Sequence, residues 1–239
     1  LRRGKTTVYK KWDVNTAILS GDAMLIKAYQ CLEKYPIDVF QQLTCLLSKT
    51  AIEVCEGQQY DIDFETRPDT SEEEYIEMIR LKTAVLLGCA LKMGAIIGKA
   101  SEEDQKAIYD FGIQLGLAFQ LQDDYLDTFG DPETFGKKIG GDILKDKKTI
   151  LYHLAIKAGE EDERQLLQFL MGGNETIDDD EKINKVKYLF ESTSAQSATR
   201  DFIEHHSDLA DIELEKLTIS EAQKNHFRDL KRWLINRTY

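Results

Sequence analysis

The sequence is poor in proline and cysteine, and it contains no long hydrophobic run. Only three prolines occur in 239 residues, whereas Leu, Ile, Ala, Lys and Glu are frequent, and this balance favours an all-α fold. The four cysteines show no paired spacing, so we expect buried thiols in a reducing compartment. No apolar run approaches the ~20 residues of a membrane span, and no signal peptide is visible. These absences predict a cytoplasmic protein without a membrane span, although a segment upstream of Leu1 could still carry a signal.

The charge of the chain is strongly acidic, with a formal net charge of −12. This balance argues against nucleic acid or an anionic membrane surface as the main partner. The length of the chain is sufficient to bury a substantial core, and we expect one helical domain over residues 1–239.

An acidic stretch at residues 119–127 is the most informative feature of the sequence. At about 100° per helical residue, Gln120, Asp123, Asp124 and Asp127 fall on one face. Asp123 and Asp127 are four residues apart, so their carboxylates repel unless something offsets them. A divalent cation does this, and Mg²⁺ is typically held by one or two carboxylates together with waters and substrate phosphates.

The alternative is that the acidic stripe is simply the solvated side of an amphipathic helix. The preceding turns, which begin at Ser101, count against it because apolar residues lie on both sides of the helix. Such a helix is expected to be central and buried. Carboxylates at its end then face a cavity or a partner rather than bulk water. From the residues alone, both interpretations stay open.

Basic residues are concentrated after the acidic stretch and at one position before it. A glycine-containing loop brings several ammonium groups toward an anion; its lysines are Lys137, Lys138, Lys145, Lys147 and Lys148. Lys82 directly precedes an apolar run at residues 84–91. A lysine in such surroundings is costly unless it is paired with an anion.

Periodicity and capping signals predict helices along the whole chain. The expected ranges are 13–32, 37–60, 150–158, 162–171, 179–191, 194–210 and 218–236, together with helices that begin after Ser71 and Ser101. Ser71 with Glu74, and Thr218 with Glu221, fit capping boxes. Residues 63–70 are expected to form a polar loop. The four histidines, His153, His205, His206 and His226, are expected to be structural or on the surface.

Five segments in a fixed order resemble the trans-isoprenyl diphosphate synthases, a family that includes farnesyl and geranylgeranyl diphosphate synthases. Asp123, Asp124 and Asp127 resemble the family's second aspartate-rich motif, with Phe-Gln before it and Gly-Lys and a further lysine after it. The other segments are residues 2–5, Gly21-Asp22, Gly57-Gln58 with Asp61, and Lys82-Thr83. The resemblance covers residues 2–149, and the later helices carry no matching motif.

The resemblance implies a role for each matching residue. Asp123 and Asp127 would bind Mg²⁺, with Asp124 in support and Asp61 beside the metal cluster. The allylic diphosphate would be held by Arg2, Lys82, Lys137 and Lys147, with Lys138 as an alternative to Lys137. Arg3 would hold isopentenyl diphosphate. Lys82, Thr83 and Gln120 would act at the reacting centre, where Thr83 and Gln120 lie near the developing carbocation.

The resemblance also implies the fold and the reaction. The fold would be a single all-α bundle of mostly antiparallel helices around a deep central cavity, and the protein would be a homodimer. With three Mg²⁺ ions, the enzyme would condense an allylic diphosphate with isopentenyl diphosphate to a short-chain product of the farnesyl or geranylgeranyl type. The residues that set product length precede the first aspartate-rich motif, so the chain length cannot be read here.

One departure from the family pattern leaves two alternatives. The first aspartate-rich motif would precede Leu1, so we expect a truncated enzyme whose isolated chain can be inactive. A class I terpene cyclase shares the fold, but its second motif is richer in Asn, Ser and Glu, and it lacks the Gly-Lys loop. An inactive regulatory subunit agrees with the missing motif, but it would leave the second motif and the lysines without a role.

Overall fold

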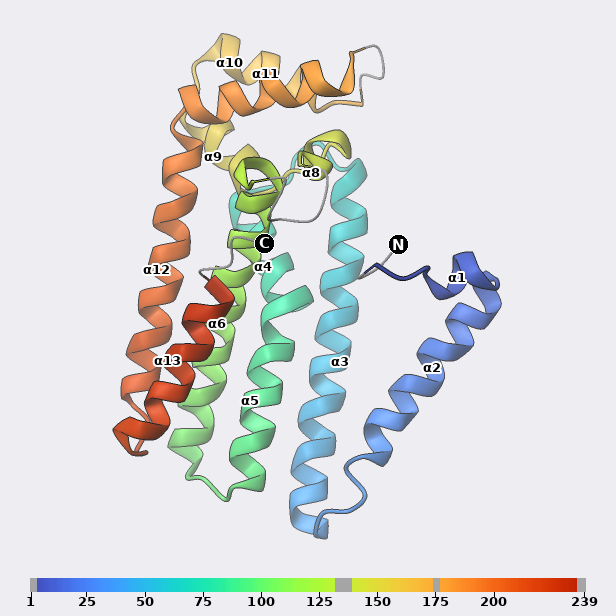
Figure 1. The fold of residues 1–239 in the computed structure, drawn as a ribbon, viewed down its shortest axis with the longest axis vertical. Coiled ribbons are helices and arrows are strands. Elements are labelled where there is room, and N and C mark those ends of the chain that lie inside the picture. The colour runs from blue at the N-terminus through green and yellow to red at the C-terminus, as the bar shows by residue number, and fades with distance from the viewer. Residues whose placement is uncertain (1–3, 132–138, 174–176, 236–239) are drawn as a thin grey trace. The chain divides into compact units, whose positions relative to one another are not determined.

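The computed structural model describes residues 4–131, 139–173 and 177–235. The elements within these ranges are helices (Figure 1), which confirms the all-α prediction. Backbone contacts divide the chain into residues 1–48 and 49–239, and each part is described by itself. The single-domain organisation stays a prediction.

The first part contains α1 (Val8–Lys11), α2 (Val14–Gln30) and the beginning of α3 (Ile37–Thr66). Asp13 caps α2, because its carboxylate accepts a hydrogen bond of 2.8 Å from the Thr16 amide. The sequence pattern of α2 predicts an apolar face that points inward, and this prediction is wrong within the described residues. Ile18 and Met24, for example, are 57% and 68% exposed. Periodicity marks an apolar face on a helix, but it does not say what covers that face.

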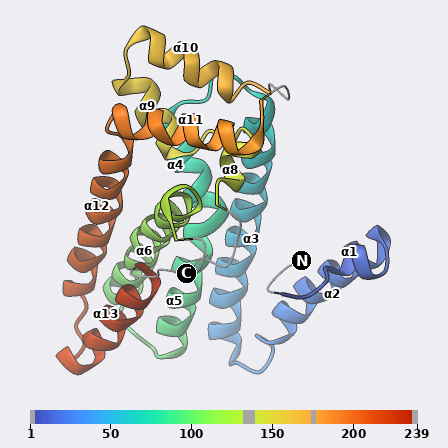
Figure 2. The same cartoon turned by 45° about the horizontal axis from the view of Figure 1, so that its top comes forward.

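The second part begins at Lys49 within α3 and contains the remaining helices. They are α4 (Glu72–Ile79), the π-helical turn η1 (Arg80–Ala84), α5 (Val85–Ile97), α6 (Glu102–Phe129), α8 (Gly141–Leu144), α9 (Ile150–Ala158), α10 (Glu161–Leu170), α11 (Asp179–Ser192), α12 (Ala195–Glu215) and α13 (Glu221–Ile235). In this part α5, α6 and α12 run alongside one another, while α10 and α11 lie across one end (Figures 1 and 2).

Helix α6 is the central element of the second part. Ser101 caps it through the Asp104 amide, and α6 packs against α5 and α12. Phe111, Leu115 and Leu121 are fully buried, and Leu117 is 4% exposed. Complete burial of such side chains stabilises a fold by roughly 1.5–3 kcal/mol each. The prediction of a buried central helix is therefore confirmed.

Glycines let α5 and α6 approach closely at one level. A Cβ atom on Gly112 would lie 2.6 Å from the Cα atom of Gly88, so any side chain there would push the helices apart. At Gly21 and Gly94, by contrast, a Cβ atom would meet no atom of the described structure within 4 Å outside the backbone of its own helix.

Several helix ends differ from the sequence predictions. Helix α3 continues through Gly57 to Thr66, so residues 63–66 are helical rather than part of the loop, and α12 extends to Glu215. The predicted capping box at Thr218 is wrong because Asp104, distant in sequence, accepts hydrogen bonds from the Thr218 amide at 2.8 Å and hydroxyl at 2.6 Å. Ser220 and Gln223 cap the start of α13 instead. The box at Ser71 and Glu74 is confirmed.

The cysteines are free thiols, but only Cys89 is buried. Burial raises the pKa of the Cys89 thiol, which makes this side chain a poor nucleophile. Cys31, Cys45 and Cys55 are exposed, so the prediction of burial is wrong for these three. Apolar residues occur near them in sequence, but each cysteine lies on a face of α3, or at the end of α2, that the described residues leave open.

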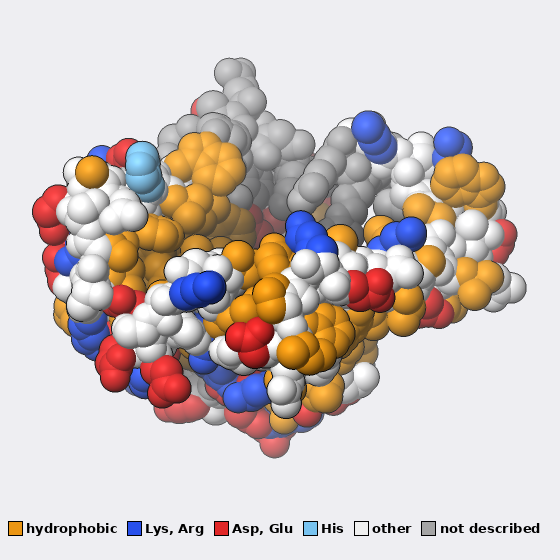
Figure 3. Space-filling model, turned by 90° about the horizontal axis from the view of Figure 1, so that it is seen from below, with side chains coloured by type: hydrophobic (Ala, Val, Ile, Leu, Met, Phe, Trp, Pro, Cys, Tyr) orange, Lys and Arg blue, Asp and Glu red, His pale blue; other side chains and the backbone are white. Residues whose placement is uncertain are grey.

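One face of the described structure is mixed in charge. Figure 3 shows acidic and basic side chains interspersed with hydrophobic ones on the face seen from below. This pattern is typical of an ordinary solvated surface rather than of the continuous basic face that binds nucleic acid. Among the described helices, none is long and apolar enough to cross a membrane.

Candidate functional site

A cavity of about 520 Å³ lies where the end of α3, the segment α4–η1, α6 and residues 141–149 meet. Six carboxylate side chains line it: Asp61, Glu65, Asp123, Asp124, Asp127 and Asp142. Four lysines line it as well: Lys82, Lys145, Lys147 and Lys148. The acidic stretch and the described part of the basic loop, adjacent in sequence, thus face one space.

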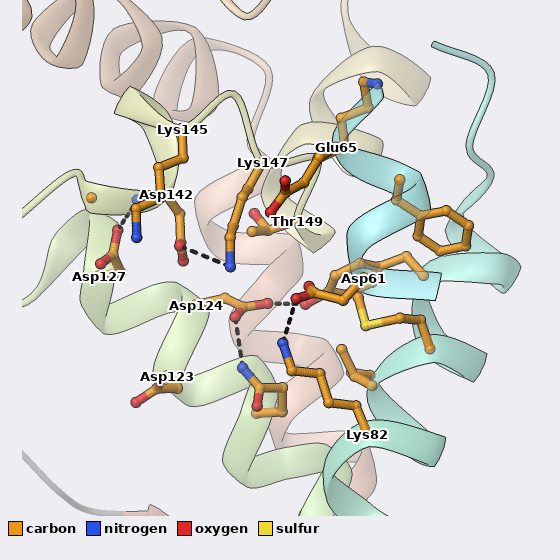
Figure 4. Close-up of a pocket in the computed structure, with 17 residues that line it drawn as sticks. Asp61, Glu65, Lys82, Asp123, Asp124, Asp127, Asp142, Lys145, Lys147 and Thr149 are labelled. Atoms are coloured by element: carbon orange, nitrogen blue, oxygen red, sulfur yellow. Dashed lines mark hydrogen bonds and ion pairs between the residues drawn. The ribbon is translucent and has the colours of Figure 1, made fainter. Parts of the chain in front are cut away.

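The second aspartate-rich motif occupies the C-terminal end of α6. Gln120, Asp123, Asp124 and Asp127 all line the cavity, so the predicted face is confirmed. Figure 4 shows Asp123 pointing away from Asp124, on the same side as Asp127. The Asp127 carboxylate accepts a hydrogen bond of 2.8 Å from the Asp142 amide. The Gly140 amide donates to the Asp127 carbonyl at 2.7 Å, so the motif also orders the start of the basic segment.

Asp124 differs from the other two motif aspartates because it is buried. Its side chain accepts hydrogen bonds from the Tyr75 hydroxyl and from the Gln120 amide, the latter at 3.0 Å. Burial raises the pKa of Asp124 well above its usual value, and the neighbouring Asp142 carboxylate adds to the effect. Its hydrogen bonds to Tyr75 and Gln120 agree with a supporting position for Asp124.

The π-helical turn η1 presents two predicted residues to the cavity. Lys82 reaches across to α3, where its ammonium group lies 2.6 Å from the Asp61 carboxylate (Figure 4). Thr83 reaches toward α6, where its hydroxyl donates a hydrogen bond of 3.0 Å to the Gln120 carbonyl. The structure thus brings Lys82 and Asp61 together, as it does Thr83 and Gln120.

The basic segment after α8 brings Lys147 into the carboxylate group. Its ammonium nitrogen lies 3.7 Å from the Asp142 carboxylate. Burial by itself would lower the pKa of Lys147, but the nearby carboxylates of Asp142 and Asp61 outweigh it, and the pKa is raised. Lys147 therefore stays protonated and is available to an anion.

Contacts outside the cavity hold the same segment in place. Lys148 donates to the Arg67 carbonyl. Asp146, at a left-handed φ of +55°, accepts a hydrogen bond of 2.6 Å from Lys182, whose side chain is only 7% exposed. An L-residue in this conformation is costly unless its surroundings impose it. The buried Lys182 ammonium supplies that constraint.

Some predicted residues cannot be placed, and some lining residues were missed. Arg2, Arg3, Lys137 and its alternative Lys138 lie outside the described residues. Sequence reasoning did not single out Glu65, Tyr75 and Asp142. A signal existed for Asp142, since it follows a glycine pair and lies in the first turn of the short helix α8. No local pattern marks Tyr75, which contacts Asp124 because the fold brings α4 beside α6. Gln58 does not line the cavity but lies 3.4 Å from Asp61.

The donors around the cavity fit a divalent cation that is shared with a substrate. The described residues contain no group of three or more His, Cys, Asp or Glu side chains arranged to hold a metal ion by themselves. Mg²⁺ does not need such a group, because one or two carboxylates with waters and phosphates complete its shell. Asp123 and Asp127 supply two carboxylates at the same side of the cavity.

His153, on α9 behind the cavity, is expected to make the fold sensitive to acid. Its side chain is 7% exposed, and burial lowers its pKa from 6.5 to about 4. Because the folded pKa lies below the unfolded one, stability from His153 is complete above pH 6.5 and is lost as the pH falls toward 4. The loss amounts to about 3 kcal/mol at most. Denaturant unfolding at several pH values measures it.

The His153→Gln variant is expected to show a shallower fall in the free energy of unfolding between pH 6.5 and 4. His226→Gln is the matched control because His226 is exposed, and its profile should follow that of the unsubstituted protein. Burial also lowers the pKa of His206 to about 4, so the free energy of unfolding of His153→Gln will still fall somewhat over this pH range. Identical slopes for His153→Gln and the unsubstituted protein would contradict the assignment.

Comparison with known proteins places this geometry in a family. The polyprenyl synthetase family model matches residues 1–191. A short chain isoprenyl diphosphate synthase of Methanothermobacter thermautotrophicus is 35% identical over 226 residues, covering 94% of this chain and 68% of the relative. A crystal structure of a geranylgeranyl pyrophosphate synthase is 53% identical, with a TM-score of 0.94 over 99% of this chain and 73% of that one.

A solved structure with ligands bears on the metal. The geranylgeranyl pyrophosphate synthase of Corynebacterium glutamicum was solved in complex with isoprenyl diphosphate and magnesium. It is 26% identical to this chain, with a TM-score of 0.84 over 95% of this chain and 65% of that one. This similarity agrees with the use of a divalent metal in the family. From the family match, the relatives and the shared fold, the chain belongs to the polyprenyl synthetase family, the trans-isoprenyl diphosphate synthases.

Proposed function

We propose that this protein is a Mg²⁺-dependent trans-prenyltransferase that condenses an allylic diphosphate with isopentenyl diphosphate. The product is a short-chain isoprenyl diphosphate of the farnesyl or geranylgeranyl type. The observation that carries the proposal is that Asp123 and Asp127 face the same cavity as Lys82 and Lys147. Carboxylates that recruit a cation and lysines that bind phosphate oxygens together suit a diphosphate headgroup.

The cavity also suits the hydrocarbon part of such a substrate. Phe64, Met78 and Ile79 line it beside the charged groups, and apolar walls with a few polar groups are typical of small-molecule sites. These side chains limit the access of water to the reacting carbon. This matters because water would compete with isopentenyl diphosphate for an allylic cation.

In this proposal each polar residue has a defined task. Asp123 and Asp127, with Asp124 in support and Asp61 nearby, hold Mg²⁺. When bound, the metal neutralises the charge that develops on the departing diphosphate. Lys82 and Lys147 bind the same diphosphate oxygens and stabilise their negative charge. The Thr83 and Gln120 oxygens direct their dipoles toward the carbon from which the diphosphate departs.

The remaining assignments rest on the family resemblance. Arg2 and Lys137 are proposed to bind the allylic diphosphate, and Arg3 is proposed to bind isopentenyl diphosphate, since the arginine fork matches phosphate oxygens. Isopentenyl diphosphate then attacks the allylic carbon through its double bond, and loss of a proton to the released diphosphate completes the condensation. The presence of three Mg²⁺ ions, a homodimer and a cytoplasmic location stay predictions.

A direct assay tests the proposed function. The natural protein that carries this chain is incubated with Mg²⁺, isopentenyl diphosphate and dimethylallyl, geranyl or farnesyl diphosphate, and dephosphorylated products are sized by mass spectrometry. Products that grow in five-carbon steps, and that disappear when Mg²⁺ is chelated, are the expected result. A cyclic hydrocarbon from one substrate would indicate a terpene cyclase instead. Intact substrates with a folded protein would indicate a regulatory subunit.

A further inference from the structure

The π-helical turn η1 determines where Lys82 and Thr83 point. It spans Arg80–Ala84, between α4 and α5. A π-turn contains one residue more than an α-helical turn, so it changes the direction of its side chains relative to the regular helix on either side. Here the two neighbouring residues reach opposite partners: Lys82 binds Asp61 on α3, and Thr83 binds Gln120 on α6.

On the α3 side, the turn packs directly against Gly57. A Cβ atom at this position would lie 2.3 Å from the Lys82 backbone nitrogen and 2.8 Å from the Leu81 carbonyl carbon. Both are main-chain atoms, so the clash could not be relieved by rotating a side chain. The Asp61 carboxylate accepts a hydrogen bond from the Lys82 ammonium group. Asp61 lies four residues after Gly57 and therefore on the same face of α3.

On the α6 side, the turn packs in the same way against Gly116. A Cβ atom there would lie 2.5 Å from the Ala84 Cα atom and 2.8 Å from its Cβ atom. Gln120, whose side-chain oxygen accepts a hydrogen bond from the Thr83 hydroxyl, lies four residues after Gly116. Each helix thus presents a glycine to the backbone of the turn and, one turn later, a polar partner to its side chain.

We propose that Gly57 and Gly116 are positioning residues for prenyl transfer, because together they hold η1 at the separation at which Lys82 reaches Asp61 and Thr83 reaches Gln120. This inference rests on the proposed function. The two glycines touch no substrate; they act through the backbone of the turn. Gly57 controls the residue that binds the diphosphate, and Gly116 controls the pair of oxygens that faces the reacting carbon.

The proposal predicts different kinetic effects for the two alanine variants of the natural protein. Gly57→Ala raises KM for the allylic diphosphate about tenfold or more because Lys82 is displaced. Gly116→Ala lowers kcat by up to about a hundredfold, with a smaller change in KM, because Thr83 and Gln120 separate. A merely structural clash would reduce the amount of folded enzyme without producing this division between KM and kcat.

Two glycines provide matched controls. Gly112→Ala introduces a comparable backbone clash with Gly88, at 2.6 Å, one helical turn from the contact between Gly116 and η1. It lowers stability, and it changes the kinetic constants of the folded fraction much less than Gly57→Ala or Gly116→Ala does. The Cβ atom added by Gly94→Ala in α5 meets no atom within 4 Å outside the backbone of its own helix. This variant changes neither the stability nor the kinetic constants. Kinetic changes in Gly112→Ala as large as those in Gly57→Ala and Gly116→Ala would overturn the proposal.

Amide hydrogen exchange gives a readout that does not depend on turnover. Peptides that cover residues 78–88 should exchange faster in Gly57→Ala and Gly116→Ala, and at the unsubstituted rate in Gly94→Ala. If the variants show this exchange pattern but the unsubstituted protein does not turn over substrate, the proposed function fails and the positioning role stands. Unchanged exchange and unchanged kinetics in both alanine variants would overturn the positioning role.

A second type of variant covers the case in which an alanine substitution prevents folding. Ala84→Gly removes the side-chain atom that faces Gly116 and introduces no clash. It should loosen the turn, speed amide exchange over residues 78–88 and lower kcat several-fold, by roughly 3–10 times. The proposal would be contradicted if Ala84→Gly had the same amide exchange rates and the same kcat as the unsubstituted protein.

Discussion

Asp123→Ala is expected to abolish prenyl transfer in the natural protein, with kcat/KM falling by at least about a thousandfold. The expectation follows from the place of Asp123 at the end of α6, where it lines the cavity with Asp127. Removal of one of the two carboxylates weakens the site for Mg²⁺. The departing diphosphate then loses several kcal/mol of charge stabilisation, and about 4 kcal/mol corresponds to a thousandfold in rate.

Asp110→Ala is a control on the same helix. Asp110 lies two turns into α6 and forms an i, i+4 pair with the exposed Lys106, so its loss should change stability little and leave kcat/KM unchanged. Raising the Mg²⁺ concentration should recover part of the activity of Asp123→Asn but not of Asp123→Ala. Near-wild-type turnover by folded Asp123→Ala would refute the metal assignment.

Lys82→Met is expected to lower kcat/KM for the allylic diphosphate by about a hundredfold, or about 2.7 kcal/mol. A hydrogen bond between charged groups contributes roughly 1.5–3 kcal/mol. Methionine keeps most of the aliphatic volume of lysine, and the remaining cavity contacts should therefore persist. Steady-state kinetics with the allylic substrate varied, and with isopentenyl diphosphate varied, measure the two KM values separately.

The effect of Lys82→Met should be specific to the allylic substrate. KM for isopentenyl diphosphate should change much less, because a different cation, Arg3, is proposed to bind it. Lys185→Met is the matched control, since Lys185 on α11 pairs with the exposed Glu181 at the surface. Equal losses for both substrates would show that Lys82 acts on the fold of the cavity through Asp61 rather than on the allylic diphosphate.

The sequence by itself predicted the part of the site that lies on one continuous helix. Gln120, Asp123, Asp124 and Asp127 share a face because the α-helix has a fixed period, whatever surrounds it. The burial of α6 also followed from local information, since apolar residues continue on both sides of the acidic line. The same holds for caps that are satisfied within a few residues, such as Ser71 with Glu74.

Tertiary contacts decided the features that the local pattern could not contain. The predicted cap at Thr218 failed because Asp104, from the start of α6, binds both the amide and the hydroxyl of Thr218. Residues 63–66 join α3 although their composition resembles a loop. The apolar face of α2 was expected to be buried, but periodicity alone could not identify a partner for it.

The arrangement of the cavity combines both kinds of information. The resemblance of the sequence to the trans-isoprenyl diphosphate synthases was sufficient to name Lys82, Thr83, Asp61 and Lys147 as one group. Their pairing was not readable, because the π-turn that turns Lys82 toward Asp61 and Thr83 toward Gln120 exists only where two glycines on other helices leave room for its backbone. Helical periodicity is a local property and is written in the sequence, whereas the approach of separate backbones depends on packing and is decided by the tertiary structure.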